Sequence, residues 1–235
     1  MVKKFNKARE YNLLSDYSKR KVKRLVGEGI RTIEHRIIAS EREKNFFDGN
    51  RNYGYGGLKY DGRWSGVAKK IIKKFNLKNN SKVLQIASEK GFLIYEIKKI
   101  NSKIKILGVE TSKYAASQTI KPVKKFIRKV KSFSDLGSIN SKFDCVIALG
   151  AVYIHTLSDA IHLLKNIQRL SNGKSFITLA SYQNEKDYWL FKDWTVLGTL
   201  LYKKEEWKKI MKYAGYKGYY SFTNSKKLNL KRKKT

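Results

Sequence analysis

Short apolar runs and longer amphipathic segments alternate along the chain from Ser65 onward. The apolar runs predict strands at residues 83–87, 105–110, 126–130, 143–149, 175–181 and 218–223. Between them, apolar residues recur at helical spacing, which predicts helices at residues 67–75, 92–100, 112–119, 158–170 and 204–214. Near-continuous apolar strands separated by helices are typical of a parallel sheet covered on both faces. We therefore expect a doubly wound, mostly parallel α/β sheet.

The pattern divides the chain into four parts. Residues 1–45 carry apolar positions at mixed helical spacing among many charges, which predicts a basic extension of one or two amphipathic helices. Residues 46–64 are rich in Gly and Tyr, and we expect an ordered cap loop because its aromatic side chains would be costly to leave in water. Residues 65–224 form the α/β domain, and residues 225–235 lack apolar periodicity and are expected to be a disordered basic tail.

In doubly wound sheets, ligands bind beyond the carboxyl ends of the strands, where the strand order reverses. Four segments follow the first four predicted strands directly, and they are residues 88–91, 110–113, 131–135 and 150–156. We expect the functional site to be built from these loops.

Charge is the unusual feature of the composition. The 52 Lys and Arg residues against 19 Asp and Glu residues give a formal net charge of +33. Such an excess indicates attraction to polyanions such as RNA, but a general bias toward lysine explains it equally well, because Lys occurs in every segment. Both ends are enriched, at Lys19–Arg24 and at Lys226–Thr235.

The remaining composition restricts the class of protein. The 235 residues suffice for one sizeable core with an appendage. There is no apolar run of about 18 residues and no secretory apolar region, so we expect a cytoplasmic protein without a membrane span. The one cysteine, Cys145, excludes a disulfide framework within the chain and a paired-cysteine metal clip, and its apolar surroundings predict a buried strand residue.

A glycine-containing segment follows the first predicted strand. The sequence KVLQIASEKGFL, residues 82–93, resembles the first motif of class I S-adenosylmethionine (SAM) methyltransferases, VLDxGCGxG, and the form VLDxGCxKGFL of one bacterial branch. Gly91 matches the glycine that opens the following helix. Gln85 stands where an aspartate is usual, Ala87 replaces the first glycine, and Ser88 takes the next small position. The resemblance implies a Rossmann-like, seven-stranded fold with SAM as cofactor.

Further residues at strand ends agree with that resemblance. Glu110 ends the second strand, where the family acid accepts hydrogen bonds from both ribose hydroxyls. Its spacing from Gly91 also occurs in dinucleotide-binding folds, which leaves a nicotinamide enzyme as an alternative. The resemblance extends the expected cofactor contacts to Thr111, Ser132, Leu149 and Gly150.

Two long segments carry the resemblance to the bacterial branch. YGYGGLKYDGRW, residues 53–64, resembles its YGYGGYxYDGRW box, and SYQNEKDYWLFKDWTV, residues 181–196, resembles a second box. The resemblance implies an acceptor site covered by a cap that includes Tyr53, Tyr55, Tyr60, Arg63, Trp64, Tyr182 and Glu185. Alternatively, the first five of these residues pin the cap loop to the sheet, and Glu185 is a solvated residue at a helix start.

The loop after the fourth strand contains two candidate catalytic residues. Tyr153 matches an aromatic or histidine position of the branch. His155 could take a proton from an acceptor hydroxyl, although the usual polar Asn of the branch aligns with Ile154.

Three functions remain open at this stage. The first is SAM-dependent methyl transfer to a small-molecule or sugar-like acceptor, in which the protein mainly positions the reactants. The second is a catalytically degenerate methyltransferase fold that binds RNA or an acidic partner through its basic surface. The third is an RNA methyltransferase, although no NPPY-like tetrapeptide or cysteine motif of RNA methylation follows the fourth strand.

Overall fold

The computed structural model describes residues 7–15, 17, 24–134 and 136–233. Its centre is a sheet in the order β1 (Arg9–Glu10), β9 (Tyr219–Thr223), β7 (Ser175–Tyr182), β6 (Cys145–Ala148), β3 (Lys82–Ile86), β4 (Lys105–Glu110) and β5 (Ile127–Lys129). The two-residue strand β8 (Tyr202–Lys203) pairs with the end of β7, and the strand pairs described within the sheet are all parallel. The predicted doubly wound α/β fold is thus confirmed.

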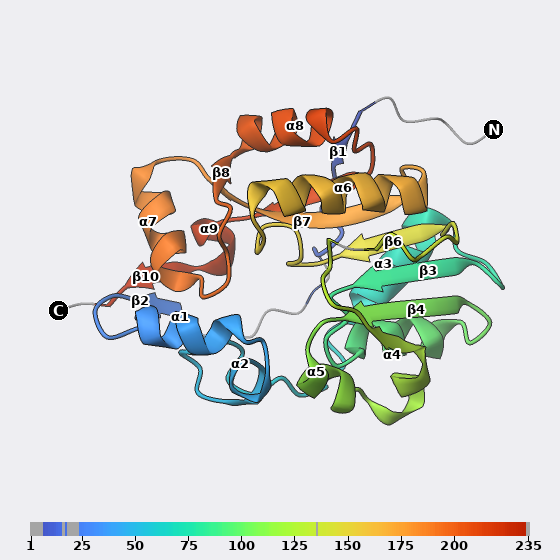
Figure 1. Cartoon of the computed structure of the whole chain (residues 1–235), viewed down its shortest axis with the longest axis horizontal. Coiled ribbons are helices and arrows are strands. Elements are labelled where there is room, and N and C mark those ends of the chain that lie inside the picture. Colours follow the sequence, from blue (N-terminus) through green and yellow to red (C-terminus); the bar gives the residue numbers. More distant parts are fainter. Residues whose placement is uncertain (1–6, 16, 18–23, 135, 234–235) are drawn as a thin grey trace.

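Helices cover both faces of this sheet (Figure 1). One face packs on α3 (Ser65–Phe75) and α4 (Phe92–Ile100), and the other packs on α6 (Leu157–Ser171) and α8 (Lys204–Tyr213). Strand β3 serves both layers, because Val83 belongs to the core cluster of the first face and Leu84 to that of the second. This alternation along a buried strand explains why the sequence reads as an unbroken apolar run.

The strand order reverses at β3, which pairs with β4 on one side and β6 on the other. The chain runs from β3 through α4 to β4, then through α5 (Lys113–Ser117) and the 3-10 helix η1 (Lys121–Phe126) to β5. It then crosses to β6 and continues outward to β7 and β9. The carboxyl ends of β3, β4 and β6 therefore border the switch point where ligands bind in such sheets.

A smaller two-stranded sheet lies beside the main sheet (Figure 1). Strand β2 (Arg24–Val26) pairs with β10 (Leu230–Arg232) in parallel, next to α7 (Glu185–Trp194) and α9 (Ser225–Leu228). The prediction of disorder beyond residue 224 is wrong for residues 225–233. Leu230 is buried with Val26 and Leu190, and the backbone of β10 pairs with a strand some two hundred residues away. The local sequence pattern therefore could not predict this strand.

The N-terminal extension contains helices, as expected, but also strands. Helix α1 (Ile33–Ser40) and helix α2 (Lys44–Asp48) are preceded by β1 and β2. Most of the basic run Lys19–Arg24 lies outside the described residues. No helix in the described ranges has both the length and the apolar character to cross a membrane. Cys145 lies buried in β6, where burial raises the pKa of its thiol.

The loop between β3 and α4 has an unusual backbone. Ala87 has a φ of +56° and Glu89 a φ of +52°, and Gly91 follows with a φ of +77°. A left-handed conformation places Cβ against the following carbonyl and costs an L-residue about 1–2 kcal/mol. At Ala87, which stands at a position where the resemblance implies a glycine, this chain therefore adopts positive φ without the freedom of glycine.

We expect Ala87→Gly to leave the free energy of unfolding within about 0.5 kcal/mol of the wild type. The loss of a buried methyl group and the higher entropy of unfolded glycine, about 0.8 and 0.5–1 kcal/mol, oppose the relief of strain. The matched control is Ala115→Gly in α5, a buried alanine without positive φ, which should lose about 2 kcal/mol. Urea denaturation measures both variants, and equal losses would mean that Ala87 is unstrained.

Candidate functional site

Glu110 lies at the end of β4 with no exposed surface. Its Oε2 accepts a hydrogen bond from the backbone N–H of Glu89 at 2.8 Å, and its Oε1 accepts from the N–H groups of Thr111 at 2.9 Å and Ser112 at 3.1 Å. These N–H groups belong to the β3–α4 loop and to the start of α5. A buried carboxylate needs such donors, and they hold the two loops together at the switch point.

Arg42 covers this carboxylate from the N-terminal extension. Its Nη2 lies 3.3 Å from Oε1 of Glu110, and its guanidinium carbon lies 5.4–5.9 Å from the ring centres of Phe46, Phe47 and Phe133. The side chain is 15% exposed, its Nε is buried without a partner among the described residues, and its backbone has a φ of +52°. A strained backbone together with an incompletely paired cation often marks a functional position.

Two acids that follow Arg42, Glu43 of the extension and Asp48 of the cap loop, fix this part of the chain against the α5 region. Glu43 accepts hydrogen bonds from the N–H groups of Lys113 at 2.9 Å and Tyr114 at 2.7 Å, so it caps α5. Asp48 lies 2.6 Å from the Nζ of Lys90 and also accepts from the Tyr114 hydroxyl and the Leu58 N–H. Partial burial would raise the pKa of Asp48, but the Lys90 and Tyr114 hydrogen bonds hold it below its usual value.

The end of β3 and the loop that follows it offer two unpaired polar atoms. The Oε1 of Gln85 in β3 and the Oγ of Ser88 in the β3–α4 loop are buried and make no hydrogen bond with a described residue. An unpaired buried polar atom is costly, so these two atoms are the ones most ready for a ligand here. The missing side chain of Gly91 leaves room for two neighbouring side chains, because a Cβ there would lie 3.0 Å from Thr119 Cγ2 and 3.1 Å from Val123 Cγ2.

Glu89 projects from the same loop and accepts a hydrogen bond from the Tyr55 hydroxyl. Burial raises the pKa of Glu89 to about 7, while the Tyr55 hydrogen bond and the charge of Arg42 oppose that rise. The carboxyl group therefore changes charge near neutral pH, and it does so beside Glu110, whose charge also raises its pKa.

The loop after β6 brings Tyr153 and His155 to the same region. Burial, and secondarily the charge of Glu89, raise the pKa of Tyr153 to about 12. The ring of His155 lies 6.2 Å from that of Phe133, which also contacts Arg42. Burial lowers the pKa of His155, and its Nε2 is buried and has no hydrogen-bond partner in the part of the chain that the structure describes. This imidazole is therefore neutral near pH 7 and has a nitrogen available.

The other cofactor residues expected from the sequence line the strand ends. The Thr111 N–H binds Glu110, and the Gly150 N–H donates to Thr178 Oγ1 at 2.7 Å. The Ser132 hydroxyl lies 2.8 Å from that of Ser134, and Leu149 packs into the core cluster beneath α3 and α4. Asp135, which follows Ser132 closely, lies outside the described residues.

Of the residues expected in the cap, Tyr55 contacts the strand-end loops. Tyr53 packs on His35, and Tyr60 donates to Glu96 and packs on Phe92 and Tyr95 of α4. Arg63 pairs with Asp61, and the Trp64 ring lies 4.6 Å from that of Tyr17. These four residues thus contact α1, α4, the loop itself and Tyr17, whereas the sheet was the partner in the alternative.

Tyr182 and Glu185 lie toward α7, at the left in Figure 1, whereas α2 and α5 lie lower in the view. Tyr182 packs on Tyr188, and Glu185 accepts a hydrogen bond from Trp189 Nε1 at 3.3 Å. Glu185 lines a shallow pocket with Trp189 and Arg232 and has no described contact with the Glu110 cluster. The structure thus does not bring these two residues together with Glu110.

Sequence reasoning missed Arg42 and Glu89. Arg42 lies in the extension, before the predicted α/β domain of residues 65–224, and nothing in its local sequence distinguishes it from its charged neighbours. Glu89 occupies a variable position of the first motif, although an acid so close to Gln85, where the usual acid is missing, was a signal that could have been used.

Comparison with known proteins gives structural matches alone. No protein-family model and no curated protein matches the chain. The structure of YcgJ from Bacillus subtilis matches with a TM-score of 0.51 at 13% identity, over 63% of this chain and 66% of that chain. The [4+2]-cyclase SpnF matches with a TM-score of 0.50 at 13% identity, over 64% of this chain and 57% of that chain.

PKMT2 from Rickettsia typhi, in complex with AdoHcy, matches at 23% identity with a TM-score of 0.38. That match covers 46% of this chain and 22% of PKMT2, so the chain spans about a fifth of that protein. Other neighbours are described as methyltransferases. At these identities the likeness is one of fold: the chain has the α/β Rossmann-like fold found in class I methyltransferases.

Proposed function

We propose that the chain is a SAM-dependent methyltransferase that acts on a small-molecule or sugar-like acceptor. The observation that carries the proposal is Glu110, a buried acid at the end of β4 beside the switch point of the sheet. A carboxylate there suits a vicinal diol, because it accepts two hydrogen bonds at one spacing. The orphan atoms of Gln85 and Ser88 support the proposal, since a bound cofactor would supply the partners that they lack.

In this proposal the strand-end residues hold the cofactor. Glu110 would bind the ribose. The rest of the cofactor would lie against the end of β3 and against the loops after β3, β4, β5 and β6. The residues that border it there would be Gln85, Ala87, Ser88, Gly91, Thr111, Ser132, Leu149 and Gly150. SAM would supply a methyl group on a sulfonium leaving group, which needs little help beyond positioning.

Glu89 would supply the negative charge that Gln85 lacks. An ammonium group in a buried site needs a nearby carboxylate, and Glu89 is the acid of the β3–α4 loop, which begins just after Gln85 and the end of β3. Its position between the Tyr55 hydroxyl and the N–H contact with Glu110 holds it at the strand ends.

Tyr153 and His155 would line the acceptor side. The neutral imidazole of His155, with Nε2 unpaired, suits a general base that takes a proton from an acceptor hydroxyl. Tyr153 carries a phenol that stays protonated near pH 7, so it can donate a hydrogen bond that orients the acceptor. Tyr55 is the cap residue we retain for this site, because it reaches Glu89.

One observation favours a second candidate, a methyltransferase fold kept as a binding module. Arg42 covers the carboxylate that the ribose would use, and in a module this contact would be permanent. In an enzyme, Arg42 must leave Glu110 when the cofactor binds.

The two candidates differ in how Glu110 and Arg42 affect SAM binding. If the chain is an enzyme, Glu110→Gln should raise the dissociation constant for SAM about tenfold to a hundredfold. This is the effect of losing about 1.5–3 kcal/mol from a hydrogen bond to a charged group. Arg42→Gln should tighten it several-fold, because the cofactor no longer displaces a cation. Calorimetric titration measures both, and lack of binding by the folded wild-type chain at millimolar SAM would favour the module.

SAM affinity should also depend on pH through Glu89. The pKa of this group is raised to about 7, so below that pH it is neutral and must lose a proton to pair with the ammonium group. The dissociation constant should therefore rise by up to tenfold per pH unit below about 7 and level off above it. Titrations at pH 6 and pH 8 test this dependence.

Several charged or titratable groups surround Glu89, namely Tyr55, Lys90, Glu110, Arg42 and Tyr153. The control is therefore Glu89→Gln, which should bind SAM more weakly and with little pH dependence. An unaltered pH profile in that variant would assign the proton to another group. Restoring the usual acid with Gln85→Asp in the Glu89→Gln background should recover affinity.

A further inference from the structure

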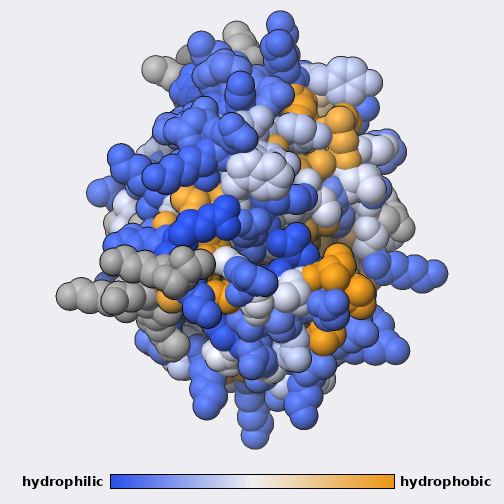
Figure 2. Space-filling model, turned by 90° about the vertical axis from the view of Figure 1, so that its left-hand side faces the viewer, coloured by the Kyte–Doolittle hydropathy of each residue, from blue (hydrophilic) through white to orange (hydrophobic). Residues whose placement is uncertain are grey.

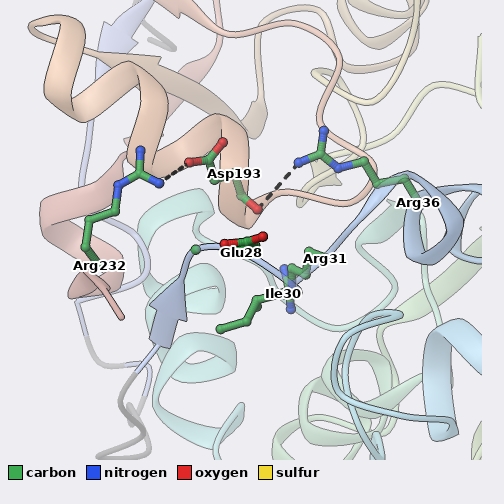
Figure 3. A pocket seen from close by; sticks show the side chains of 7 residues that line it. Glu28, Ile30, Arg31, Arg36, Asp193 and Arg232 are labelled. Carbon is green, nitrogen blue, oxygen red and sulfur yellow. Dashed lines mark hydrogen bonds and ion pairs between the residues drawn. The ribbon is translucent and has the colours of Figure 1, made fainter. Parts of the chain in front are cut away.

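A second pocket lies away from Glu110, between the β2–α1 connection, the end of α7 and β10 (Figure 3). Its volume is about 270 Å³, just below the range of about 300–1,000 Å³ that is usual for small-molecule sites. It is lined by Gly27, Glu28, Ile30, Arg31, Arg36, Asp193 and Arg232. Three of these seven residues are arginines, and Arg232 comes from a segment about two hundred residues from Arg31 and Arg36, so the fold gathers positive charge here.

The arginines at this pocket are bonded mainly to the backbone. Arg31 is 7% exposed and donates to the carbonyl oxygens of Trp194, Arg51 and Gly54. Arg36 donates to the carbonyls of Lys192 at 2.9 Å and Asp193 at 3.5 Å, and its Nε is buried without a partner. Within the described residues, neither guanidinium has an ion pair with a carboxylate.

Two more arginines extend this cluster. Arg24 donates to the Leu228 carbonyl at 2.9 Å, and Arg51 donates to the Gly54 carbonyl. Burial, followed by the charges of Arg51, Arg24 and Arg36, lowers the pKa of Arg31 to about 9. No carboxylate contributes to that shift, so the electrostatic environment of Arg31 is dominated by other cations.

The acids near the pocket compensate little of this charge. Asp193 pairs with Arg232, and both lie in the view of Figure 3. Glu28 is exposed and makes no ion pair with a described residue. The carbonyls at the end of α7 contribute a helix dipole worth about half a negative charge, which is small against four guanidinium groups. Capping of α7 therefore explains where Arg31 and Arg36 sit but does not neutralise them.

We propose that this pocket binds the phosphate group of a small phosphate ester. Guanidinium groups recognise phosphate through planar, paired N–H donors, and the dianion would neutralise charge that the protein leaves uncompensated. Arg31 is recessed, so the ligand must enter the pocket, which favours a small ester over an extended nucleic acid backbone. The neighbouring face is mostly hydrophilic, with separate hydrophobic patches, which agrees with a charged ligand (Figure 2).

The test uses inorganic phosphate and glucose 6-phosphate as probes on the full chain. Calorimetric titration at constant ionic strength, set with chloride, should give saturable binding of both. Arg36→Gln should raise the dissociation constants of both probes at least tenfold, because it removes a guanidinium with a free N–H. The matched control is Arg169→Gln, since Arg169 also donates to two backbone carbonyls, those of Leu136 and Ile139, but outside the pocket. It should bind as the wild type does.

Arg232→Gln is a second variant at the exposed rim, useful if Arg36→Gln does not fold. It should also weaken phosphate binding, because it leaves Asp193 unpaired beside the anion. The proposal would be overturned if the phosphate titrations gave no more heat than a chloride titration. Phosphate binding that is unchanged in both Arg36→Gln and Arg232→Gln would also overturn it. Displacement of phosphate by an RNA oligonucleotide without terminal phosphates, lost in Arg36→Gln, would overturn the small ester in favour of RNA.

Discussion

The buried carboxylate of Glu110 is the constraint on which the rest of the site depends. Glu110 has no exposed surface. Burying a carboxylate costs on the order of several kcal/mol in lost solvation unless hydrogen-bond donors surround it. Here the donors come from the β3–α4 loop, from the start of α5 and from Arg42 of the extension. One charge thus fixes the relative positions of three segments that are separate in the sequence, and the acids Glu43 and Asp48 complete the attachment.

This arrangement links the proposed cofactor to the N-terminal extension. Arg42 and a ribose would use the same carboxylate, so the extension and the cofactor compete unless Arg42 moves. The left-handed backbone of Arg42 and its unpaired Nε indicate a contact that is not at its energetic optimum. The arginine pocket lies toward the other end of α1, which makes this short helix a physical connection between the two sites.

Much of the fold could be predicted from the sequence, because buried parallel strands such as β3 and β6 leave apolar runs that need no knowledge of their partners. Glu110 and the β3–α4 loop could be predicted as well, since a strand end is visible locally. Strand β10 and the contact of Arg42 could not, because each depends on a partner far away along the chain. The left-handed backbone of Ala87 was equally hidden, since alanine gives no sign of positive φ.

The central claim is that the cofactor replaces Arg42 at Glu110. A crystal structure of the full chain with S-adenosylhomocysteine tests it most directly. The account predicts the ribose hydroxyls on the Glu110 carboxylate, the Arg42 guanidinium displaced from Oε1, and the ammonium group beside Glu89. A ligand bound elsewhere, with the Arg42–Glu110 contact intact, would contradict it.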